Sequence, residues 1–248
     1  MDREFEGRAA LITGASSGIG EATAHAFARE GAAVALAARR EERLEAIAAA
    51  LEDEYDAGTT ILPTDVREEN AVEAMVDGAA DAFGRLDAVV ANAGLARGGG
   101  IDSISTEEYR TTMETNVDGV FFTTRAAISH LRETEGVLVV LGSFAGQYPR
   151  PNNPVYAASK WWVRGFAHSV AADVGADGVG VSVINPAEVR TEFGASEGES
   201  LADHFEPGEA AEPDEIAEAI LFAARQRRST ATEIDLYRRD KLTGFTEL

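Results

Sequence analysis

The chain has 248 residues, of which 45% are hydrophobic, so it is long and apolar enough to bury the core of one α/β domain spanning residues 1–248. Its 43 acidic and 22 basic residues give a net charge of −21, which excludes nucleic acids and anionic membranes as expected partners. No apolar run is long enough to cross a bilayer, and the lack of cysteine, with four scattered histidines, excludes disulfides and predicts no metal site.

The excess of acid is accompanied by a scarcity of lysine, which occurs only at positions 160 and 241. A surface of this charge destabilises the compact state by self-repulsion, but in about 1 M salt the Debye length is only ~3 Å and the repulsion is screened. The first six residues lack the basic and apolar regions of a signal peptide. These features predict a cytoplasmic protein from a halophile, and an acidic protein from a mesophile is the alternative.

Strand and helix patterns alternate along the whole chain, which is typical of a parallel sheet with helices on both faces. Strands are predicted near residues 8–13, 33–38, 59–64, 86–91, 136–142, 179–185 and 231–236. Helices are predicted near residues 18–30, 41–55, 68–83, 106–132, 154–175 and 213–226. The expected fold is an α/β Rossmann-type three-layer sandwich with a seven-stranded parallel sheet.

Several helix ends carry their own signals. Gly31 and Gly84 follow the first and third predicted helices, where a glycine commonly adopts the left-handed conformation that ends a helix. Ser105 and Glu108 are spaced as a capping box, and Pro213 suits a first helical turn. These signals support the helix boundaries given above.

A glycine-rich turn connects the first strand to the first helix. After Thr13 it comprises Gly14, Ala15, Ser16, Ser17, Gly18, Ile19 and Gly20. Glycines here let the backbone approach a pyrophosphate, and the following helix supplies unpaired N–H groups and a partial positive charge. A purely structural turn is the alternative, but the strand–turn–helix setting favours a dinucleotide site.

The end of the second strand indicates which dinucleotide is bound. NAD-binding proteins normally place a carboxylate here for the adenosine ribose hydroxyl, whereas arginine accommodates a 2′-phosphate. The chain has Ala38, Arg39 and Arg40 at this place. These residues predict NADP (NADPH), bound through both arginines. The alternative is that the arginines are solvated charges at the start of the next helix.

Two further motifs contain asparagine. Asn92, Ala93 and Gly94 close the fourth strand, at the edge where open α/β sheets bind ligands, and are expected to shape the floor of the cofactor site. Asn116 lies inside a predicted helix, where asparagine has poor propensity, which suggests a functional role. A structural asparagine that bonds locally is the alternative.

Ser143, Tyr156 and Lys160 form the most informative pattern. Tyr156 and Lys160 are four residues apart and share one helix face. A tyrosine hydroxyl titrates near a pKa of ~10, and a nearby ammonium favours the phenolate and lowers that pKa. Ser143, thirteen residues before the tyrosine, can hold the oxygen that exchanges the proton. Alone, the Tyr–Lys pair would more often be a surface feature of a helix, but the other motifs favour a catalytic group.

Together, these motifs resemble the short-chain dehydrogenase/reductase family in order and spacing over nearly the whole chain. The resemblance implies hydride transfer between NADP(H) and a small alcohol or carbonyl substrate, with Tyr156 as the general acid or base. It implies that Lys160 lowers the Tyr156 pKa and holds the nicotinamide ribose. It also implies that Ser143 orients the substrate oxygen and that Asn116 supports a water chain that returns the proton.

The resemblance extends to further cofactor contacts. Asp65 and Val66, after the third strand, match the family's adenine contact. After the sixth strand, Pro186, Val189 and Thr191 match its nicotinamide clamp. These five residues complete the expected cofactor site.

The clamp departs from the family pattern at one position. Ala187 stands where the family has glycine, so either its backbone has φ below zero or a modest strain is tolerated. The stretch 187–212 is rich in Gly, Ala and Glu with little periodicity, and is expected to be a mobile lid or a disordered loop.

The substrate is the least determined part of the prediction. Arg97 and Arg150 lie in loops expected to face the site, and either could pair with a substrate carboxylate, with solvation at the rim as the alternative. Residues 232–239 resemble the serine/3-hydroxy-acid branch of the family more than its acyl-carrier-protein reductases. The leading hypothesis is an NADP-dependent oxidoreductase that acts on a small alcohol, such as a hydroxy acid. A 3-oxoacyl thioester reductase and an NADP-sensing regulator are the alternatives. The resemblance also implies a homotetramer or homodimer.

Overall fold

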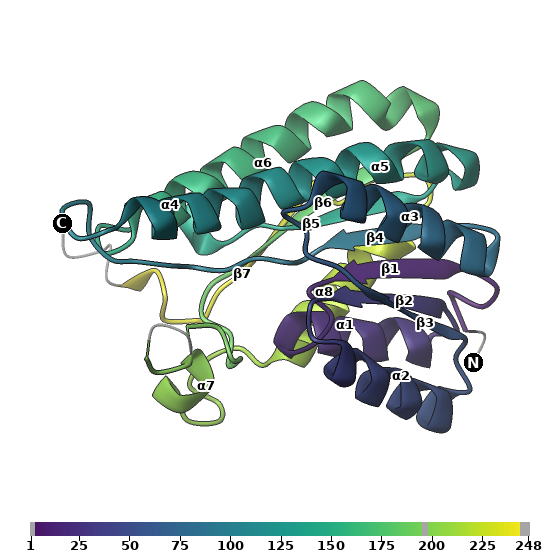
Figure 1. Ribbon diagram of the computed structural model, residues 1–248, viewed down its shortest axis with the longest axis horizontal. Helices are drawn as coiled ribbons and strands as arrows, with labels where there is room; N and C mark the ends of the chain where they lie inside the picture. Colours follow the sequence, from purple (N-terminus) through teal and green to yellow (C-terminus); the bar gives the residue numbers. More distant parts are fainter. Residues whose placement is uncertain (1–2, 195–197, 244–248) are drawn as a thin grey trace.

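The computed structural model describes residues 3–194 and 198–243 and contains a parallel sheet of seven strands in the order β3-β2-β1-β4-β5-β6-β7 (Figure 1). The strands are β1 (Ala9–Thr13), β2 (Ala33–Ala38), β3 (Thr59–Pro63), β4 (Ala88–Ala91), β5 (Val137–Leu141), β6 (Gly180–Pro186) and β7 (Glu233–Leu236). The predicted seven-stranded parallel sheet is confirmed. The strand order reverses between β1 and β4, and sheets of this kind bind ligands at the carboxyl ends of the strands beside such a reversal.

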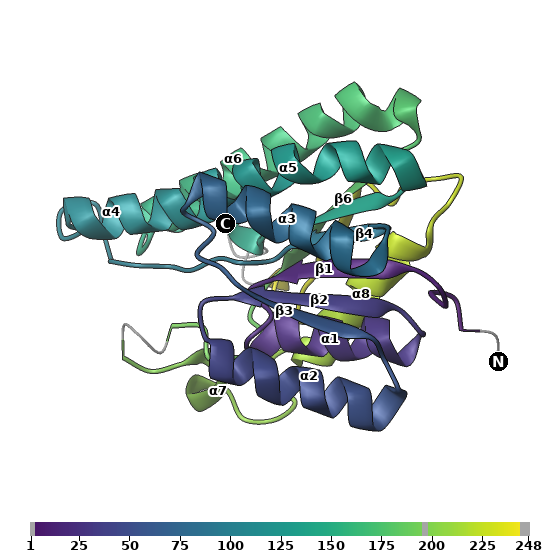
Figure 2. The ribbon, with the colours of Figure 1, turned by 45° about the vertical axis from the view of Figure 1, so that its right-hand side comes forward.

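Helices cover both faces of the sheet, as Figures 1 and 2 show. On one face lie α1 (Gly18–Arg29), α2 (Glu41–Tyr55) and α8 (Pro213–Arg225). On the other face lie α3 (Glu69–Phe83), α4 (Thr106–Met113), α5 (Gly119–Thr134) and α6 (Pro154–Val174). The three-layer arrangement expected from the alternating pattern is therefore confirmed.

Two hydrophobic cores, one on each face, arise from the alternation of side chains along the strands. β1, β4 and β5 are buried along their whole length. Ile12, Leu36 and Val139 belong to the core under α1, α2 and α8. Leu11 and Leu138 belong to the core under the other helices. Strands buried on both faces read as continuous apolar runs, which is why the sequence pattern predicts them well.

The predicted helix ends are also confirmed. Gly31 and Gly84 follow α1 and α3 with positive φ values of 87° and 69°. At the start of α4, the Ser105 N–H donates to Glu108 Oε2 at 2.7 Å and the Glu108 N–H donates to Ser105 Oγ at 3.2 Å. Pro213 is the first residue of α8.

The helix predicted over residues 106–132 is interrupted by a π-helical turn. This turn covers Glu114–Asp118, between α4 and α5, and its buried residues are Thr115 and Asn116. A π-turn adds a residue to the helical hydrogen-bond ladder and recurs at functional sites. Hydrophobic periodicity does not reveal it, because the helical course continues on both sides.

The segment 187–212 contains regular structure that the sequence pattern did not predict. A short helix, α7 (Leu201–His204), begins at a capping box formed by Ser200 and Asp203. The Ser-x-x-Asp signal is local and can start a helix even where periodicity is weak. Residues 195–197 of the expected lid lie outside the described residues.

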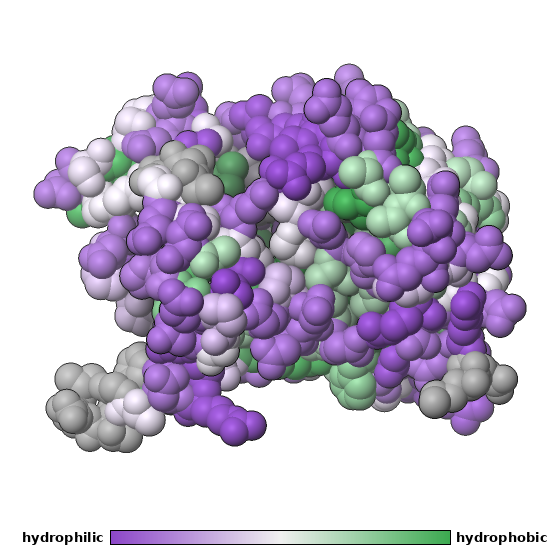
Figure 3. Space-filling view, turned by 90° about the horizontal axis from the view of Figure 1, so that it is seen from below, coloured by the Kyte–Doolittle hydropathy of each residue, from purple (hydrophilic) through white to green (hydrophobic). Residues whose placement is uncertain are grey.

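In the part of the chain that the structure describes, no helix combines the length and the apolar character needed to span a membrane. Figure 3 shows one face of the molecule, which is mainly hydrophilic with scattered apolar side chains. This appearance agrees with the acidic excess of the sequence.

Candidate active site

The parallel topology gathers the predicted site residues at one edge of the sheet. The glycine-rich turn, the Arg39–Arg40 pair and Asp65 follow β1, β2 and β3, and the remaining loops follow β4, β5 and β6. In Figure 1 these loops extend from the left-hand side of the sheet, where α7 also lies. This is the edge at which open α/β sheets bind their ligands.

Thr13 ties the glycine-rich turn to the motif after β4. Its Oγ1 accepts hydrogen bonds from the backbone N–H groups of Asn92 at 3.0 Å and Ala93 at 3.1 Å. The Asn92 side chain in turn donates to the Thr13 carbonyl oxygen at 2.8 Å. Two predicted cofactor motifs, separated by 79 residues in sequence, thus form one hydrogen-bonded unit.

Close contacts and backbone conformation require glycine at three positions of the turn. Gly14 and Gly18 have φ values of +67° and +56°. A Cβ atom at Gly20 would lie 2.2 Å from the Gly14 carbonyl oxygen, and one at Gly18 would lie 2.9 Å from Thr191 Cγ2. At the start of α1, the Ser17 side chain makes no capping hydrogen bond. The free backbone N–H groups there fit the phosphates of a dinucleotide.

The Arg40 guanidinium lies across the glycine-rich turn. It donates to Ser17 Oγ at 2.7 Å and to Ser16 Oγ at 3.1 Å. It also pairs with Glu192 at 2.9 Å. Arg39 is exposed on the same loop. The structure therefore places Arg40, more than Arg39, in contact with the turn.

Asp65 is held by a neighbouring arginine. Arg67 donates to its carboxylate through Nη2 at 2.6 Å and Nε at 3.0 Å. The pKa of Asp65 is lowered, mainly by this hydrogen bonding and to a smaller degree by the charge of Arg39. Val66 is buried against Gly119, where a Cβ atom would lie 2.8 Å from Val66 Cγ2. A carboxylate and two arginines are thus present where the adenosine part of a dinucleotide is expected.

Lys160 is buried within the site, with 5% of its surface exposed. Its Nζ donates to the Leu141 carbonyl oxygen at 2.7 Å and lies 5.9 Å from the centroid of the Tyr156 ring. Burial lowers the pKa of Lys160 to about 8, because removal from water disfavours the ammonium. A Cβ atom at Gly94 would lie 3.6 Å from Nζ, so glycine keeps space open beside the lysine.

Tyr156 is buried as well, with 7% exposed. Burial raises the pKa of its phenol above the ordinary value, and a hydrogen bond with Ser143 and the charge of Arg150 offset only part of this rise. The prediction that Lys160 lowers the pKa of Tyr156 is therefore wrong for this structure, because burial of the phenol outweighs the groups that favour the phenolate. In the structure, the Lys160 hydrogen bond goes to a backbone carbonyl, and Ser143 and Arg150 are the groups that favour the phenolate.

Ser143 is fixed through both its backbone and its side chain. Its N–H donates to Asn185 Oδ1 at 3.2 Å, and its Oγ accepts from the Ala145 N–H at 3.1 Å. The buried Asn185 amide donates to Glu233 at 2.6 Å and to Asp235 at 2.9 Å. The position of Ser143 therefore depends on two acidic residues of β7.

Glu233 is the centre of a polar network that no sequence motif predicts. Arg164 donates to it at 2.6 Å, Gln147 at 2.7 Å, and a nitrogen of His168 lies at 3.2 Å. Burial alone raises the pKa of Glu233, but the hydrogen bonds from Arg164 and Gln147 outweigh burial and lower the pKa to about 2. The feature of the sequence that could have indicated this network is the pair of acidic residues in the last strand. Glu233 and Asp235 share one face of a strand, where acidic residues are disfavoured.

Asn116 is completely buried in the π-turn. Its Oδ1 accepts from the Leu95 N–H at 2.9 Å, and its Nδ2 donates to the Leu95 carbonyl at 2.8 Å and to Ser159 Oγ at 3.0 Å. These three bonds fix the amide orientation and leave one lone pair of Oδ1 for a further donor. The asparagine thus joins the loop after β4 to α6.

The predicted nicotinamide clamp begins where β6 ends at Pro186. The Ala187 N–H donates to the Leu236 carbonyl at 3.0 Å, and Ala187 is not among the non-glycine residues with positive φ. Alanine therefore replaces glycine without left-handed strain. Val189 is buried, and Thr191 packs against the glycine-rich turn.

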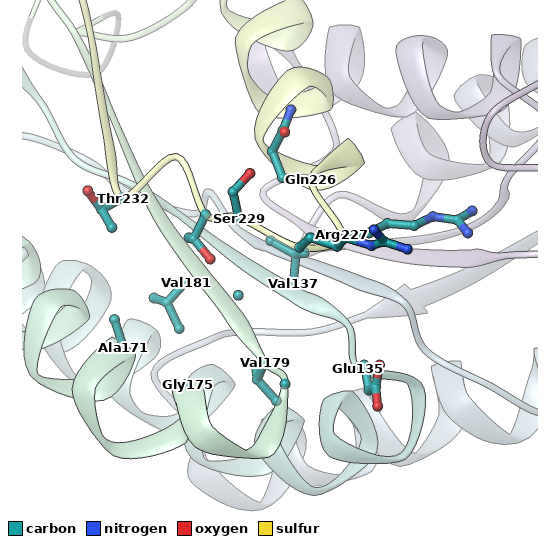
Figure 4. A pocket seen from close by; sticks show the side chains of 14 residues that line it. Glu135, Val137, Ala171, Gly175, Val179, Val181, Gln226, Arg227, Ser229 and Thr232 are labelled. Carbon is teal, nitrogen blue, oxygen red and sulfur yellow. The ribbon is translucent and has the colours of Figure 1, made fainter.

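Two hollows of the surface lie elsewhere, at the amino ends of the strands. One, of about 260 Å³, is lined by Glu135, Val137 and Arg227 among others (Figure 4). The other lies beside Arg8 and Tyr55. Because ligands of such sheets bind at the carboxyl ends of the strands, the side-chain geometry described above defines the candidate site.

Comparison with known proteins agrees with this geometry. The short chain dehydrogenase family profile matches residues 8–202. D-threitol dehydrogenase of Mycolicibacterium smegmatis is 34% identical over 95% of this chain and 93% of its own length. Trans-4-hydroxycyclohexanecarboxylate dehydrogenase of Sinomonas cyclohexanicum is 31% identical over 95% and 92%. Sulfoacetaldehyde reductase 2 of Chromohalobacter salexigens is 36% identical over 74% and 73%.

Solved structures are similar over almost the whole chain. An alcohol dehydrogenase from the archaeon Thermococcus sibiricus, complexed with 5-hydroxy-NADP, has a TM-score of 0.86 and 34% identity and covers 93% of this chain and 96% of its own. The 3-ketoacyl-(acyl-carrier-protein) reductase from Brucella melitensis, complexed with NADH, has a TM-score of 0.82 and 30% identity with the same coverage. These proteins differ in cofactor and substrate, so similarity alone does not choose among them.

Proposed function

Because the chain belongs to the short chain dehydrogenase family, we propose that it is an NADP-dependent oxidoreductase that interconverts a small alcohol, foremost a hydroxy acid, and its carbonyl compound. The observation that carries the proposal is the grouping of Ser143, Tyr156 and Lys160 at the sheet edge that also holds the glycine-rich turn. The nicotinamide cofactor, when bound, supplies the hydride donor or acceptor.

Tyr156 is proposed to give a proton to the carbonyl oxygen in reduction and to accept it from the alcohol in oxidation. General acid–base catalysis of this kind contributes roughly 10²–10⁴-fold to the rate. Ser143 Oγ accepts from the Ala145 N–H, which leaves its own hydrogen free to donate. That hydrogen can stabilise either the phenolate or the substrate oxygen.

Lys160 is proposed to hold the nicotinamide ribose and to add positive charge near the phenol. One of its three N–H donors bonds the Leu141 carbonyl, and among the described residues no second acceptor lies within hydrogen-bond distance. With a pKa of about 8, the side chain is largely ammonium at neutral pH. Asn116, whose amide is fixed by Leu95, is proposed to support the water chain that returns the proton.

Each predicted motif is proposed to bind a different part of the dinucleotide. The glycine-rich turn holds the pyrophosphate, and the acidic residue after β3 with its neighbour holds the adenine. The motif after β4 forms the floor of the site, and the clamp after β6 holds the carboxamide of the nicotinamide. In that order the residues are Gly14, Ser16, Ser17, Gly18, Ile19, Gly20; Asp65, Val66; Asn92, Ala93, Gly94; and Pro186, Val189, Thr191.

The preference for NADP is supported by the charge at the end of β2. Ala38 offers no acceptor for a ribose hydroxyl, and Arg40 lies against Ser16 and Ser17 of the turn. A 2′-phosphate would compete with Glu192 for the Arg40 guanidinium. Arginine suits this task because its planar donors match a phosphate.

A hydroxy-acid substrate is supported by relatives named for a hydroxycyclohexanecarboxylate and for sulfoacetaldehyde, both of which are anions. A 3-oxoacyl thioester reductase is the second candidate, supported by the similarity to the Brucella melitensis protein. Kinetics on free hydroxy acids and on acyl thioesters separate the two candidates.

A screen of carbonyl compounds and alcohols with NADPH, NADP, NADH and NAD at high KCl tests the proposal. Tyr156→Phe keeps the ring but removes the proton-transfer group, so it should lower turnover by at least the ~10²–10⁴-fold of a general acid–base residue and leave NADPH binding nearly intact. Wild-type turnover by Tyr156→Phe on a confirmed substrate would show that another group moves the proton.

We also propose a cytoplasmic setting at high salt and a homotetrameric or homodimeric assembly. The net charge of −21 and the scarcity of lysine support the first part. Large apolar side chains exposed on α4, α5 and α6 support the second: Tyr109 is 47% exposed, Phe121 37% and Trp161 49%. Light scattering in concentrated KCl tests the assembly, and a monomer would contradict it.

A further inference from the structure

We infer that Arg150 is the anion-recognition residue of the substrate site, so that the substrate is a small alcohol or carbonyl compound carrying a carboxylate or a sulfonate. The inference rests on the proposed function and names the substrate class for the same site.

Arg150 lies beside the reacting tyrosine. Its Cζ is 6.0 Å from the centroid of the Tyr156 ring. Its charge is also one of the influences that lower the pKa of Tyr156. The side chain is exposed, so a ligand can reach it. The guanidinium is therefore close enough to bind one end of a short substrate whose oxygen contacts the phenol.

The backbone presents Arg150 rigidly. Pro149 and Pro151 flank it, and both the ring of a proline and the residue before a proline have restricted backbone angles. The Arg150 carbonyl accepts from the Asn153 N–H at 3.1 Å, and Asn153 Oδ1 accepts from the Tyr156 N–H at 3.1 Å. The backbone of the arginine, the helix cap and the tyrosine thus form one local unit, so the backbone needs little ordering when a ligand binds.

Arg150 is not paired with a carboxylate of the residues that the structure describes. Within residues 3–194 and 198–243, no acidic side chain lies at ion-pair distance from it, although the chain has 43 acidic residues. By contrast, Arg40 at the glycine-rich turn pairs with Glu192. An anionic group that gives up part of its hydration beside the buried phenol needs a neighbouring positive charge, and the Arg150 guanidinium can supply it.

Tyr156 also packs against a group of apolar side chains. They are Ala145, Ala157, Ala96 and Phe193, whose ring centroid is 5.8 Å from that of Tyr156. A short hydroxy acid can place its carbon skeleton against these residues, its oxygen at Tyr156 and Ser143, and its anion at Arg150. In a 3-oxoacyl thioester the position of the carboxylate is taken by an uncharged thioester group, which does not need the guanidinium, so the same arrangement disfavours the second candidate function.

Paired substrates that differ only in charge test the inference. The carboxylate pair is 3-hydroxybutanoate and 3-hydroxybutanamide, and the sulfonate pair is 2-hydroxyethanesulfonate and 2-(methylsulfonyl)ethanol. For the accepted pair, the wild type should favour the anion, and Arg150→Gln should lower the anion/neutral ratio of kcat/KM by roughly ten- to a hundredfold. The ratio cancels any change that Arg150→Gln causes through the Tyr156 pKa, because both substrates use the same phenol.

Two further variants sharpen the test. Arg150→Lys keeps the charge but not the planar fork, so it should restore part of the ratio. Arg110→Gln removes an exposed arginine of α4 and should leave the ratio unchanged. Whether the enzyme accepts the carboxylate pair or the sulfonate pair shows which of the two anions the substrate carries.

The experiments distinguish a failure of the inference about Arg150 from a failure of the proposed function. If the enzyme oxidises neutral alcohols but favours no anion over its neutral partner, or if Arg150→Gln leaves the ratio at the wild-type value, the inference about Arg150 is overturned and the proposed oxidoreductase stands. If no alcohol or carbonyl compound in the wider screen reacts with any nicotinamide cofactor, the proposed function itself is overturned.

Discussion

Replacing Glu233 with glutamine should destabilise the protein at neutral pH far more than the loss of a surface ion pair would. The pKa of Glu233 is about 2, against an ordinary value of 4.5. Each pKa unit corresponds to about 1.36 kcal/mol, so the folded state favours the carboxylate by about 3 kcal/mol at pH 7. Because the side chain is only 18% exposed, we expect a loss of about 2–3 kcal/mol and a fall in Tm of about 5–10 °C.

The pH dependence of this loss has a definite sign. The Glu233 pKa is lower in the folded state than in the unfolded state, so its contribution is complete above pH 4.5 and is lost as the pH falls through about 2. Urea unfolding at fixed KCl should therefore give a free-energy gap between wild type and Glu233→Gln that narrows by about 2 kcal/mol from pH 7 to pH 3.

Glu69→Gln provides the matched control. Glu69 pairs with Arg125 on the surface, and its side chain is 48% exposed. Its loss should change the free energy of unfolding by at most ~1 kcal/mol. Equal urea midpoints for wild type and Glu233→Gln at pH 7, or a gap that stays constant down to pH 3, would refute the reasoning. Either result would mean that the donors around Glu233 do not stabilise its carboxylate.

Two further predictions concern the cofactor and salt. NADPH should bind roughly ten- to a hundredfold tighter than NADH, and Arg40→Ala should remove more of this preference than Arg39→Ala, because Arg40 contacts the glycine-rich turn. Fluorescence titration measures both affinities, and equal wild-type affinities would contradict the prediction. Tm should rise by many degrees between about 0.1 M and 2 M KCl, because salt screens the acidic surface. Differential scanning calorimetry measures Tm at each KCl concentration. A Tm that stays constant or falls as KCl is added would mean that the negative charge is not an adaptation to salt.

Local sequence signals predicted most of the fold and the chemical groups of the site. The buried strands are continuous apolar runs, and the helix caps depend on residues three apart, as at Ser105 and Glu108. Tyr156 and Lys160 lie one helical turn apart on α6, so their proximity also follows from local geometry. In each case the interacting groups are neighbours in sequence, and one chain segment contains the whole pattern.

Contacts between distant segments were not predictable in the same way. Glu233 meets Asn185 across 48 residues, and Arg40 meets Glu192 across 152. The first contact depends on the register of β7 against β6, and the second on the course of the loop after β6. The Tyr156 pKa belongs to this class as well, because its direction depends on burial and on which side chains reach the phenol.

Salt should separate the chemistry of the site from the recognition of its substrate. Lys160 and Tyr156 are 5% and 7% exposed, whereas Arg150 is exposed, and mobile ions screen buried charges much less than exposed ones. The pH profile of alcohol oxidation should therefore stay in place between about 0.1 M and 2 M KCl, while the preference for anionic over neutral substrates weakens. Steady-state kinetics on one charged and neutral pair, at several pH values and two salt concentrations, measures both quantities. A pH profile that moves by a full unit while the substrate preference stays constant would mean that the proton-transfer group is the exposed one and that the anion is bound by a buried charge.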